Sequence, residues 1–167
     1  MKQPRAIILA GHGLNCERET AFALTQAGAH TEIHHINDLG QDVNALSDAH
    51  ILAIPGGFSF GDHLGAGKAF ASALNARLDD GISALVERGG MVLGICNGFQ
   101  ILCEAGLLPG ALIRNDCLEF RCINQKVAIE ESNDRFNPEK CGEQLSLPIA
   151  HGEGNYRLKE AALEKLE

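Results

Sequence analysis

The sequence predicts an α/β fold with a mainly parallel sheet and a small antiparallel addition in its C-terminal third. Over the first two thirds of the 167 residues, short apolar runs alternate with helical patterns, and glycine-rich loops follow several of the runs. After Gly110 the pattern changes to short alternating runs. Strands separated by helices form parallel sheets through right-handed crossovers, whereas short alternating runs are typical of antiparallel strands.

The composition is that of a single globular domain over residues 1–167. Hydrophobic residues make up 45% and charged residues 22% of the chain, and the formal net charge is −8. No basic run is available to neutralise phosphates, so nucleic acid is not an expected partner. No apolar run approaches the length of a membrane span, and we expect a cytoplasmic protein. The six cysteines include no C-x-x-C pair, and no metal site is expected.

The first elements alternate between strand and helix. The segment Arg5–Ala10 is an apolar run and predicts a core strand. A glycine-rich loop follows, in which Asn15 is the expected N-cap of a helix that ends at about residue 26, before Gly28. Weak alternation over residues 31–35 predicts a second strand.

The middle of the chain continues this order of elements. A short helix is expected over residues 43–47 and a third buried strand over residues 51–54, followed by helices over about 66–77 and 82–87. The third strand leads into the loop Pro55-Gly56-Gly57. Such a sequence usually marks a plain turn. This one, however, follows a parallel strand at its carboxyl end, the edge of the sheet where α/β folds bind ligands.

The stretch Met91-Val-Leu-Gly-Ile-Cys96-Asn-Gly predicts a nucleophile elbow, in which a strand turns sharply into a helix. The continuous apolar run predicts a strand that is buried on both faces. Gly94 and Gly98 lie two residues on either side of Cys96, as a tight turn requires. A cysteine in such a place is exposed at a helix N-terminus, where partial positive charge favours the thiolate. The alternative is a buried, inert cysteine, which the flanking glycines disfavour.

Two backbone amides are candidates for an oxyanion hole beside Cys96. The strand before Gly57 and the strand before Cys96 are expected to end at the same edge of the sheet. The amides of Gly57 and Asn97 then converge on one oxygen next to the sulfur.

The last third predicts short antiparallel strands over residues 117–122, 127–130 and 145–150. A polar loop over residues 131–142 separates the second and third of these strands. An amphipathic tail over residues 158–166 ends the chain. Because the sequence stops inside this helical pattern, we expect it to be a truncated copy of a longer protein.

Five stretches of the sequence form a combination that is far more specific than the elbow alone. They are Pro55-Gly-Gly-Phe-Ser59 with Gly61-Asp62, Gly94-Ile-Cys-Asn-Gly-Phe-Gln100, Glu104-Ala-Gly-Leu-Leu-Pro-Gly110, Arg114-Asn115 and Pro148-Ile-Ala-His-Gly-Glu-Gly154. Together they resemble the stretches of one enzyme family, the glutaminase subunits of phosphoribosylformylglycinamidine synthase. The resemblance implies a class I glutamine amidotransferase with a flavodoxin-like, three-layer sandwich. It also implies release of ammonia from glutamine for a large synthetase subunit. That subunit uses ATP and Mg to convert formylglycinamide ribonucleotide to the amidine in purine biosynthesis, and a small subunit bridges the two. No cofactor is implied for this chain.

The resemblance assigns roles to individual residues. It implies Cys96 as the nucleophile, Gly57 and Asn97 as the oxyanion amides, and Gln100 as a residue that helps to hold the substrate glutamine. Arg114 and Asn115 resemble a loop that lines the glutamine pocket, although Cys117 stands where serine is expected. Cys16 matches an Asn-Cys pair in the family's first loop, for which the sequence suggests no role.

The sequence departs from the family pattern at the catalytic triad. The resemblance implies a His-Pro-Glu segment late in the chain, and this sequence contains none. His151 and Glu153 have the same His-x-Glu spacing, but their surroundings match the family's separate His-Gly-Glu-Gly stretch. We therefore do not expect His151 and Glu153 to be the triad.

Two other functions remain open from the sequence. One is a non-catalytic docking subunit of the same complex, which would hydrolyse no glutamine even with its partner. The other is a cysteine-elbow hydrolase of the DJ-1 or intracellular protease type. Gln100 and the Pro-Gly-Gly loop disfavour the second, since both serve to hold a glutamine amide.

Overall fold

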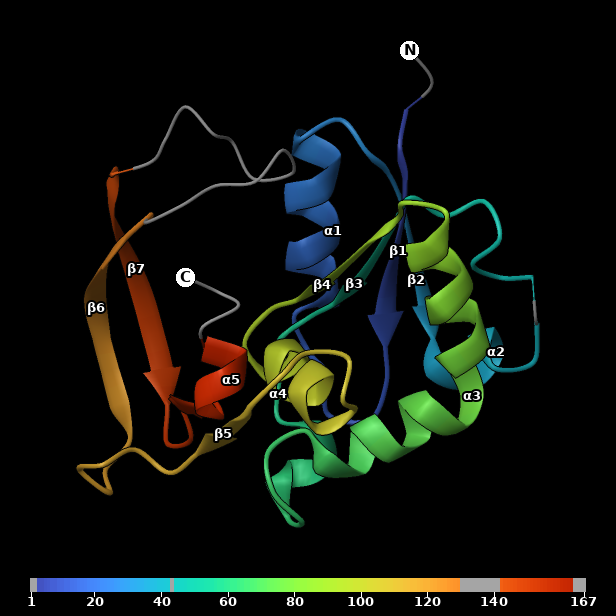
Figure 1. Ribbon diagram of the computed structural model, residues 1–167. Coiled ribbons are helices and arrows are strands. Elements are labelled where there is room, and N and C mark those ends of the chain that lie inside the picture. The colour runs from blue at the N-terminus through green and yellow to red at the C-terminus, as the bar shows by residue number, and fades with distance from the viewer. Residues whose placement is uncertain (1–2, 43, 130–141, 164–167) are drawn as a thin grey trace. The chain divides into compact units, whose positions relative to one another are not determined.

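The computed structural model describes residues 3–42, 44–129 and 142–163 (Figure 1). Contacts within the chain divide it into two compact units. The first consists of Met1–Ala111 with Leu158–Glu167, and the second of Leu112–Arg157. The first unit contains a four-stranded sheet and the second contains short paired strands.

Four parallel strands form the sheet of the first unit, in the order β2-β1-β3-β4. They are β1 (Arg5–Ala10), β2 (His30–His35), β3 (Ile51–Ile54) and β4 (Met91–Gly94). The predicted parallel sheet is confirmed, and so are all four strand positions. One detail of the prediction is wrong, because β4 is half-buried and not buried on both faces. Among the described strands it pairs with β3 alone, so it lies at an edge of the sheet.

Helices cover both faces of this sheet. Successive residues of a strand point to opposite faces, so neighbouring residues of β1 belong to different core clusters. Ile7 and Leu9 of β1 belong to the larger core cluster, together with side chains of α2 (Ile36–Leu39), α3 (Lys68–Glu87) and α4 (Asn97–Glu104). Ala6 and Ile8 belong to the second cluster, against side chains of α1 (Glu17–Gln26). Figure 1 shows α1 and α3 on opposite sides of the strands. The predicted three layers are therefore present in this unit.

Three helix predictions need correction. Asn15 is not the N-cap of α1; Cys16 occupies that position and makes no side-chain capping bond. The end of α1 agrees with the prediction, since Gly28 follows it with φ +96°. Residues 44–48 form turns, and Val43 lies outside the described residues. The short helix is instead α2, which directly follows β2.

The two helices expected over residues 66–77 and 82–87 are one helix, α3. The predicted gap between them is wrong, because residues 78–81 continue α3, and Gly81 lets a neighbour come close. A Cβ on Gly81 would lie 3.3 Å from Leu46 Cδ1. Ahead of α3 lies the short 3₁₀ turn η1 (Ser59–Asp62), and α5 (Glu160–Leu163) follows the second unit in the sequence.

The second unit consists of two strand pairs. β5 (Ala111–Ile113) pairs with β8 (Asn155–Arg157), and β6 (Arg121–Ala128) pairs antiparallel with β7 (Gln144–His151). The antiparallel addition is thus confirmed.

The strands predicted over residues 117–122 and 127–130 need correction, because residues 121–128 form one strand, β6, and residues 117–120 are not part of it. The Leu118 N–H donates to Asn115 O at 2.8 Å, and Leu118 has φ +58°, so the chain turns here and β6 begins only at Arg121. The polar loop over residues 131–142 lies outside the described residues except for Gly142, and so does the end of the tail after residue 163.

An ion pair between the first two strands should make the free energy of unfolding depend on pH in the acid range. Arg5 contacts Glu32 with two nitrogens, at 2.7 and 3.0 Å. This hydrogen bonding, followed by that from His34, lowers the pKa of Glu32 from 4.5 to about 2. A lowered carboxyl pKa contributes stability above the unfolded pKa, and this stability is lost as pH falls through the folded value.

We expect Glu32→Gln to lower the free energy of unfolding by about 1 kcal/mol at neutral pH, since the pair is partly exposed. The difference from the wild type should shrink between pH 4.5 and about 2. Urea unfolding at several pH values measures this difference. Glu87→Gln changes an exposed carboxylate on α3 and should stay within about 0.5 kcal/mol. A pH-independent loss in Glu32→Gln would contradict the assignment.

Candidate functional site

The loops after β3 and β4 leave the sheet at the same place. Ile54 and Gly94 are register partners at the carboxyl ends of these strands, and the Ile95 N–H donates to Ile54 O at 3.0 Å. The next residues stay close together. A Cβ on Gly56 would lie 3.3 Å from Cys96 Cβ. The expectation that the Pro-Gly-Gly loop and the cysteine meet at one edge of the sheet is therefore confirmed.

Cys96 has the geometry of a nucleophile elbow. Its backbone has φ +54° and ψ −112°, which an L-residue rarely adopts, and its side chain is exposed. Such strain persists only where the surrounding structure fixes it, and it is typical of functional sites. The alternative of a buried cysteine is therefore wrong, and the role of Cys96 as nucleophile stays a prediction.

The flanking glycines are required by close backbone contacts. A Cβ on Gly98 would overlap Ile54 O, and a Cβ on Gly94 would lie 2.7 Å from Gly98 O. Both glycines therefore allow the helix α4 to start directly against the ends of β3 and β4. The sequence analysis expected these glycines to permit a tight turn, and this packing agrees with that expectation.

The candidate oxyanion amides lie at defined backbone positions. Asn97 is the first residue of α4, where backbone N–H groups have no partner within the helix. Gly57 has φ +153° and forms an isolated bridge with Leu14. The bonds of this bridge run from Asn15 N to Gly56 O and from Phe58 N to Gly13 O, so they do not use the Gly57 N–H. The shared role of the Gly57 and Asn97 amides stays a prediction.

The side chains of Asn97 and Gln100 form a hydrogen-bonded chain that the sequence did not indicate. Asn97 is fully buried, and its Oδ1 accepts from the Ser59 N–H at 3.0 Å. Its Nδ2 donates to Gln100 Oε1 at 2.9 Å. Asn97 therefore connects η1, after the Pro-Gly-Gly loop, with the predicted glutamine-binding residue.

A second thiol lies close to the nucleophile. A Cβ on Gly56 would lie 3.6 Å from Cys16 Sγ. Burial raises the pKa of Cys16, and the charges of Glu19 and Cys96 raise it further. Cys16 therefore remains a thiol at neutral pH. Its Asn-Cys pair was noted in the sequence, but no residue pattern there indicates contact with the Pro-Gly-Gly loop.

In the second unit, Asn115 organises the His-Gly-Glu-Gly stretch. Asn115 is 6% exposed. Its Nδ2 donates to Glu119 O and His151 O, both at 2.9 Å. Its Oδ1 accepts from the Gly154 N–H and lies 3.0 Å from His151 Nδ1. Because an amide oxygen only accepts, Nδ1 of His151 carries the proton.

The other predicted residues of this unit have simpler environments. Arg114 is exposed and its carbonyl accepts from Asn155 Nδ2 at 3.4 Å, while Glu153 is half-buried. Cys117, which stands in the place of the expected serine, is exposed, and its Sγ accepts from Arg121 Nε at 3.1 Å. Hydrogen bonding with the Glu119 backbone, and then with Arg121, lowers the pKa of Cys117.

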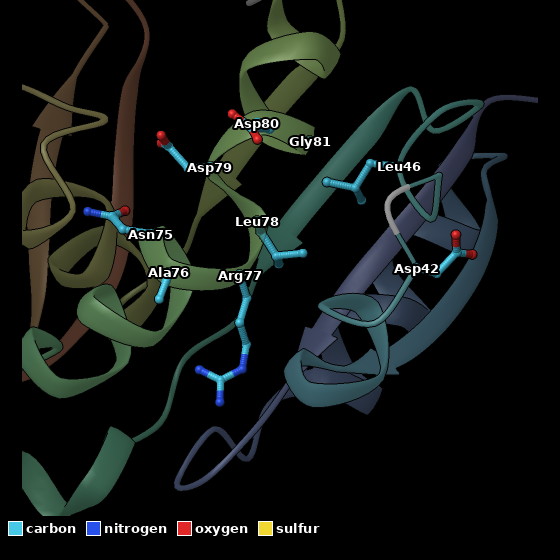
Figure 2. A pocket seen from close by; sticks show the side chains of 9 residues that line it. All are labelled: Asp42, Leu46, Asn75, Ala76, Arg77, Leu78, Asp79, Asp80 and Gly81. Carbon is cyan, nitrogen blue, oxygen red and sulfur yellow. The ribbon is translucent and has the colours of Figure 1, made fainter.

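The pocket in Figure 2 lies elsewhere in the first unit, along α3. Its lining consists of Asp42, Leu46, Asn75, Ala76, Arg77, Leu78, Asp79, Asp80 and Gly81. The lining includes aspartate, arginine and asparagine but neither cysteine nor histidine. This pocket therefore contains no nucleophile of the kind that the elbow presents.

Within residues 3–42, 44–129 and 142–163, no group of three or more His, Cys, Asp or Glu side chains is placed to hold a metal ion. In the same part of the chain, no helix combines the length and the apolar character that crossing a membrane requires.

Comparison with known proteins gives related sequences and a related structure. Residues 3–167 match the model of the CobB/CobQ-like glutamine amidotransferase domain. "Phosphoribosylformylglycinamidine synthase subunit PurQ" of Roseobacter denitrificans is 41% identical, over 97% of this chain and 70% of that protein. The subunit of the same name from Methanococcus maripaludis is 38% identical, over 98% of this chain and 63% of that protein. This chain thus spans about two thirds of the length of these relatives.

A solved structure shows the same fold. "Structure of PurLQS from Thermotoga maritima" aligns with 95% of this chain and 71% of that chain, with a TM-score of 0.80 and 34% identity. The elbow geometry, the matching family model and these relatives agree with one another. The chain therefore belongs to the glutamine amidotransferase family, as its sequence motifs predicted, and its relatives are PurQ subunits of phosphoribosylformylglycinamidine synthase.

Proposed function

We propose that this chain is the glutaminase component of a phosphoribosylformylglycinamidine synthase. It hydrolyses glutamine to glutamate and ammonia. A synthetase subunit uses the ammonia in the ATP-dependent conversion of formylglycinamide ribonucleotide to formylglycinamidine ribonucleotide, a step of purine biosynthesis. The observation that carries the proposal is the exposed Cys96 with φ +54° at the carboxyl edge of the sheet, in a chain of the glutamine amidotransferase family.

The chemistry follows from the position of the sulfur. The Cys96 thiolate attacks the side-chain amide carbon of glutamine, and the backbone N–H groups of Gly57 and Asn97 stabilise the oxyanion. The leaving nitrogen takes a proton from solvent water as the C–N bond breaks, so that it departs as ammonia. Water then hydrolyses the γ-glutamyl thioester to glutamate and the free thiol. One oxyanion donor contributes about 3 kcal/mol to lowering the barrier, roughly a hundredfold in rate.

The remaining residues are proposed for substrate binding. Gln100 holds the glutamine from α4, and Arg114 and Asn115 belong to a loop that lines its pocket. His151 and Glu153 are not assigned to a catalytic triad. The bonds between Asn115 and His151 support this, because they give His151 a structural role within its own unit.

The proposal extends to partners and location. The likeness to a chain in the PurLQS structure supports assembly with a large synthetase subunit and a small bridging subunit. The synthetase subunit uses ATP and Mg, and this chain needs no cofactor. We further propose that residues 1–167 act as one amidotransferase domain and that the protein is cytoplasmic.

Glutamine hydrolysis tests the proposal directly. Release of glutamate and ammonia is measured for the chain alone and with the synthetase subunit, its nucleotide substrate and ATP. We expect hydrolysis in the assembled complex, coupled to formation of the amidine product. Absence of hydrolysis in the assembled complex would contradict the proposal.

The second candidate is the non-catalytic docking subunit. In that case, the complex makes the amidine from added ammonia but never from glutamine. The family match favours glutamine chemistry over the other alternative, a cysteine-elbow hydrolase.

A further inference from the structure

The buried side chain of Asn97 stands between two parts of the glutaminase site. Asn97 is 0% exposed and begins α4, directly after the nucleophile. Its Oδ1 accepts from the Ser59 N–H at 3.0 Å, and its Nδ2 donates to Gln100 Oε1 at 2.9 Å. The proposed function assigns only the backbone amide of Asn97, so this side chain has no role yet.

The direction of these two hydrogen bonds is fixed by the backbone. An N–H of the main chain can only donate, so Asn97 must turn its oxygen toward Ser59. Its NH₂ group then points to Gln100 and can only donate there. Gln100 must therefore turn its oxygen toward Asn97, and its own NH₂ group lies on the other side of the amide. The orientation of the Gln100 amide is thus set by an N–H of η1.

Such fixation matters because the two ends of a glutamine amide have opposite hydrogen-bonding character. Nε2 carries two donors and Oε1 only accepts. An unconstrained amide turns either end toward a ligand, and a buried mismatch with the ligand costs affinity. Asn97 removes this freedom through its partly buried bond to Gln100, and the buried bond from the Ser59 N–H holds Asn97 itself.

We propose that the Asn97 side chain is a positioning residue that makes Gln100 present N–H donors, and not its carbonyl, to an oxygen of the bound glutamine. The inference rests on the proposed function, because it gives Gln100 a glutamine ligand. Asn97 touches no reacting atom in this role. Asn97 acts through Gln100, and the Ser59 N–H, which can only donate, fixes the orientation of the Asn97 amide.

The test is the substitution Asn97→Asp. One oxygen of the introduced carboxylate still accepts from the Ser59 N–H, but a carboxylate has no donor for Gln100. Gln100 then reverses, donates Nε2 to the carboxylate and presents its carbonyl to the ligand. The measurement is the rate at which diazo-oxonorleucine, a glutamine analogue, labels Cys96, divided by the rate for iodoacetamide. Iodoacetamide carries no amino-acid group, so the ratio cancels changes in the reactivity of the sulfur.

We expect the ratio to fall about tenfold in Asn97→Asp, which is the effect of one lost hydrogen bond to a polar ligand. Asn75→Asp is the matched control, since it also removes an Nδ2 donor, the one bonded to Ala105 O at 3.2 Å. Its ratio should match that of the wild type. An unchanged ratio in a folded Asn97→Asp protein would overturn the inference.

A double substitution separates positioning from a general structural effect. If Asn97 acts through Gln100, adding Asn97→Asp to Gln100→Ala leaves the ratio at the value of Gln100→Ala alone. Losses that multiply would show an independent effect of Asn97 and would overturn the inference.

Gln100→Glu decides the question if Asn97→Asp does not fold. This variant keeps an oxygen for Asn97 Nδ2 but replaces the donors on the other side with a second oxygen. The ratio should again fall about tenfold, and an unchanged ratio would overturn the inference. Failure of the proposed function looks different. In that case iodoacetamide labels Cys96 of the wild type while diazo-oxonorleucine does not.

Discussion

Cys96→Ala should abolish glutamine-dependent synthesis by the assembled complex, with a loss of at least about a thousandfold. Without the sulfur there is no nucleophile to attack the amide and no thioester to release ammonia. Synthesis from added ammonia should continue, because the synthetase subunit carries out that step. The measurement is amidine formation with glutamine and, separately, with ammonium salts.

Cys122→Ala is the matched control for this substitution. Cys122 is also exposed but lies on β6 in the second unit, so both activities should remain at the wild-type level. Two results would contradict the role of Cys96. One is glutamine-dependent synthesis that survives Cys96→Ala, and the other is a loss of ammonia-dependent synthesis together with it.

Gly98→Ala should have the largest effect on the fold of the first unit. The added Cβ overlaps Ile54 O and lies 2.7 Å from Ile54 C and 3.1 Å from Pro55 O. These are backbone atoms, so no side chain can rotate away, and α4 must shift from the end of β3. We expect a loss of about 3 kcal/mol in the free energy of unfolding. Urea unfolding measures this loss.

Gly152→Ala controls for the substitution of a loop glycine. A Cβ on Gly152 meets only Phe120 Cδ2, at 3.8 Å, an ordinary van der Waals contact. This variant should unfold within about 0.5 kcal/mol of the wild type. If Gly98→Ala is as stable as Gly152→Ala, then α4 does not start against Ile54 as described.

The sequence was sufficient where one local pattern determines the structure. The elbow is the best example, because a positive φ at Cys96 and the close contacts of Gly94 and Gly98 leave few alternatives. The parallel strands followed from apolar runs of strand length between helical segments. The three layers were implied by the resemblance, and the burial of β1 on both faces agrees with them.

The errors arise where tertiary contacts override a local signal. Residues 78–81 were expected to separate two helices, but they continue α3, and a Cβ on Gly81 would lie only 3.3 Å from Leu46 Cδ1. Met91–Gly94 reads as a buried strand, yet β4 has a paired neighbour on one side only among the described strands. In the second unit, the turn at Asn115–Leu118 depends on hydrogen bonds of Asn115 to residues far along the chain.

The site was predicted only in part for the same reason. Cys96 and the neighbouring glycines are adjacent in the sequence, so their spacing reveals them. The contact of Cys16 with the Pro-Gly-Gly loop, and that of Asn97 with Ser59, join residues about forty positions apart. No periodicity or spacing in one sequence shows such contacts, because they depend on which strand ends meet at the edge of the sheet.

Mass spectrometry of the chain after reaction with diazo-oxonorleucine tests the central claim most directly. The glutamine analogue should form an adduct on the peptide that contains Cys96, and excess glutamine should prevent it. An adduct on Cys16 or another cysteine, or labelling of Cys96 that glutamine does not reduce, would contradict the assignment of this elbow as a glutaminase site.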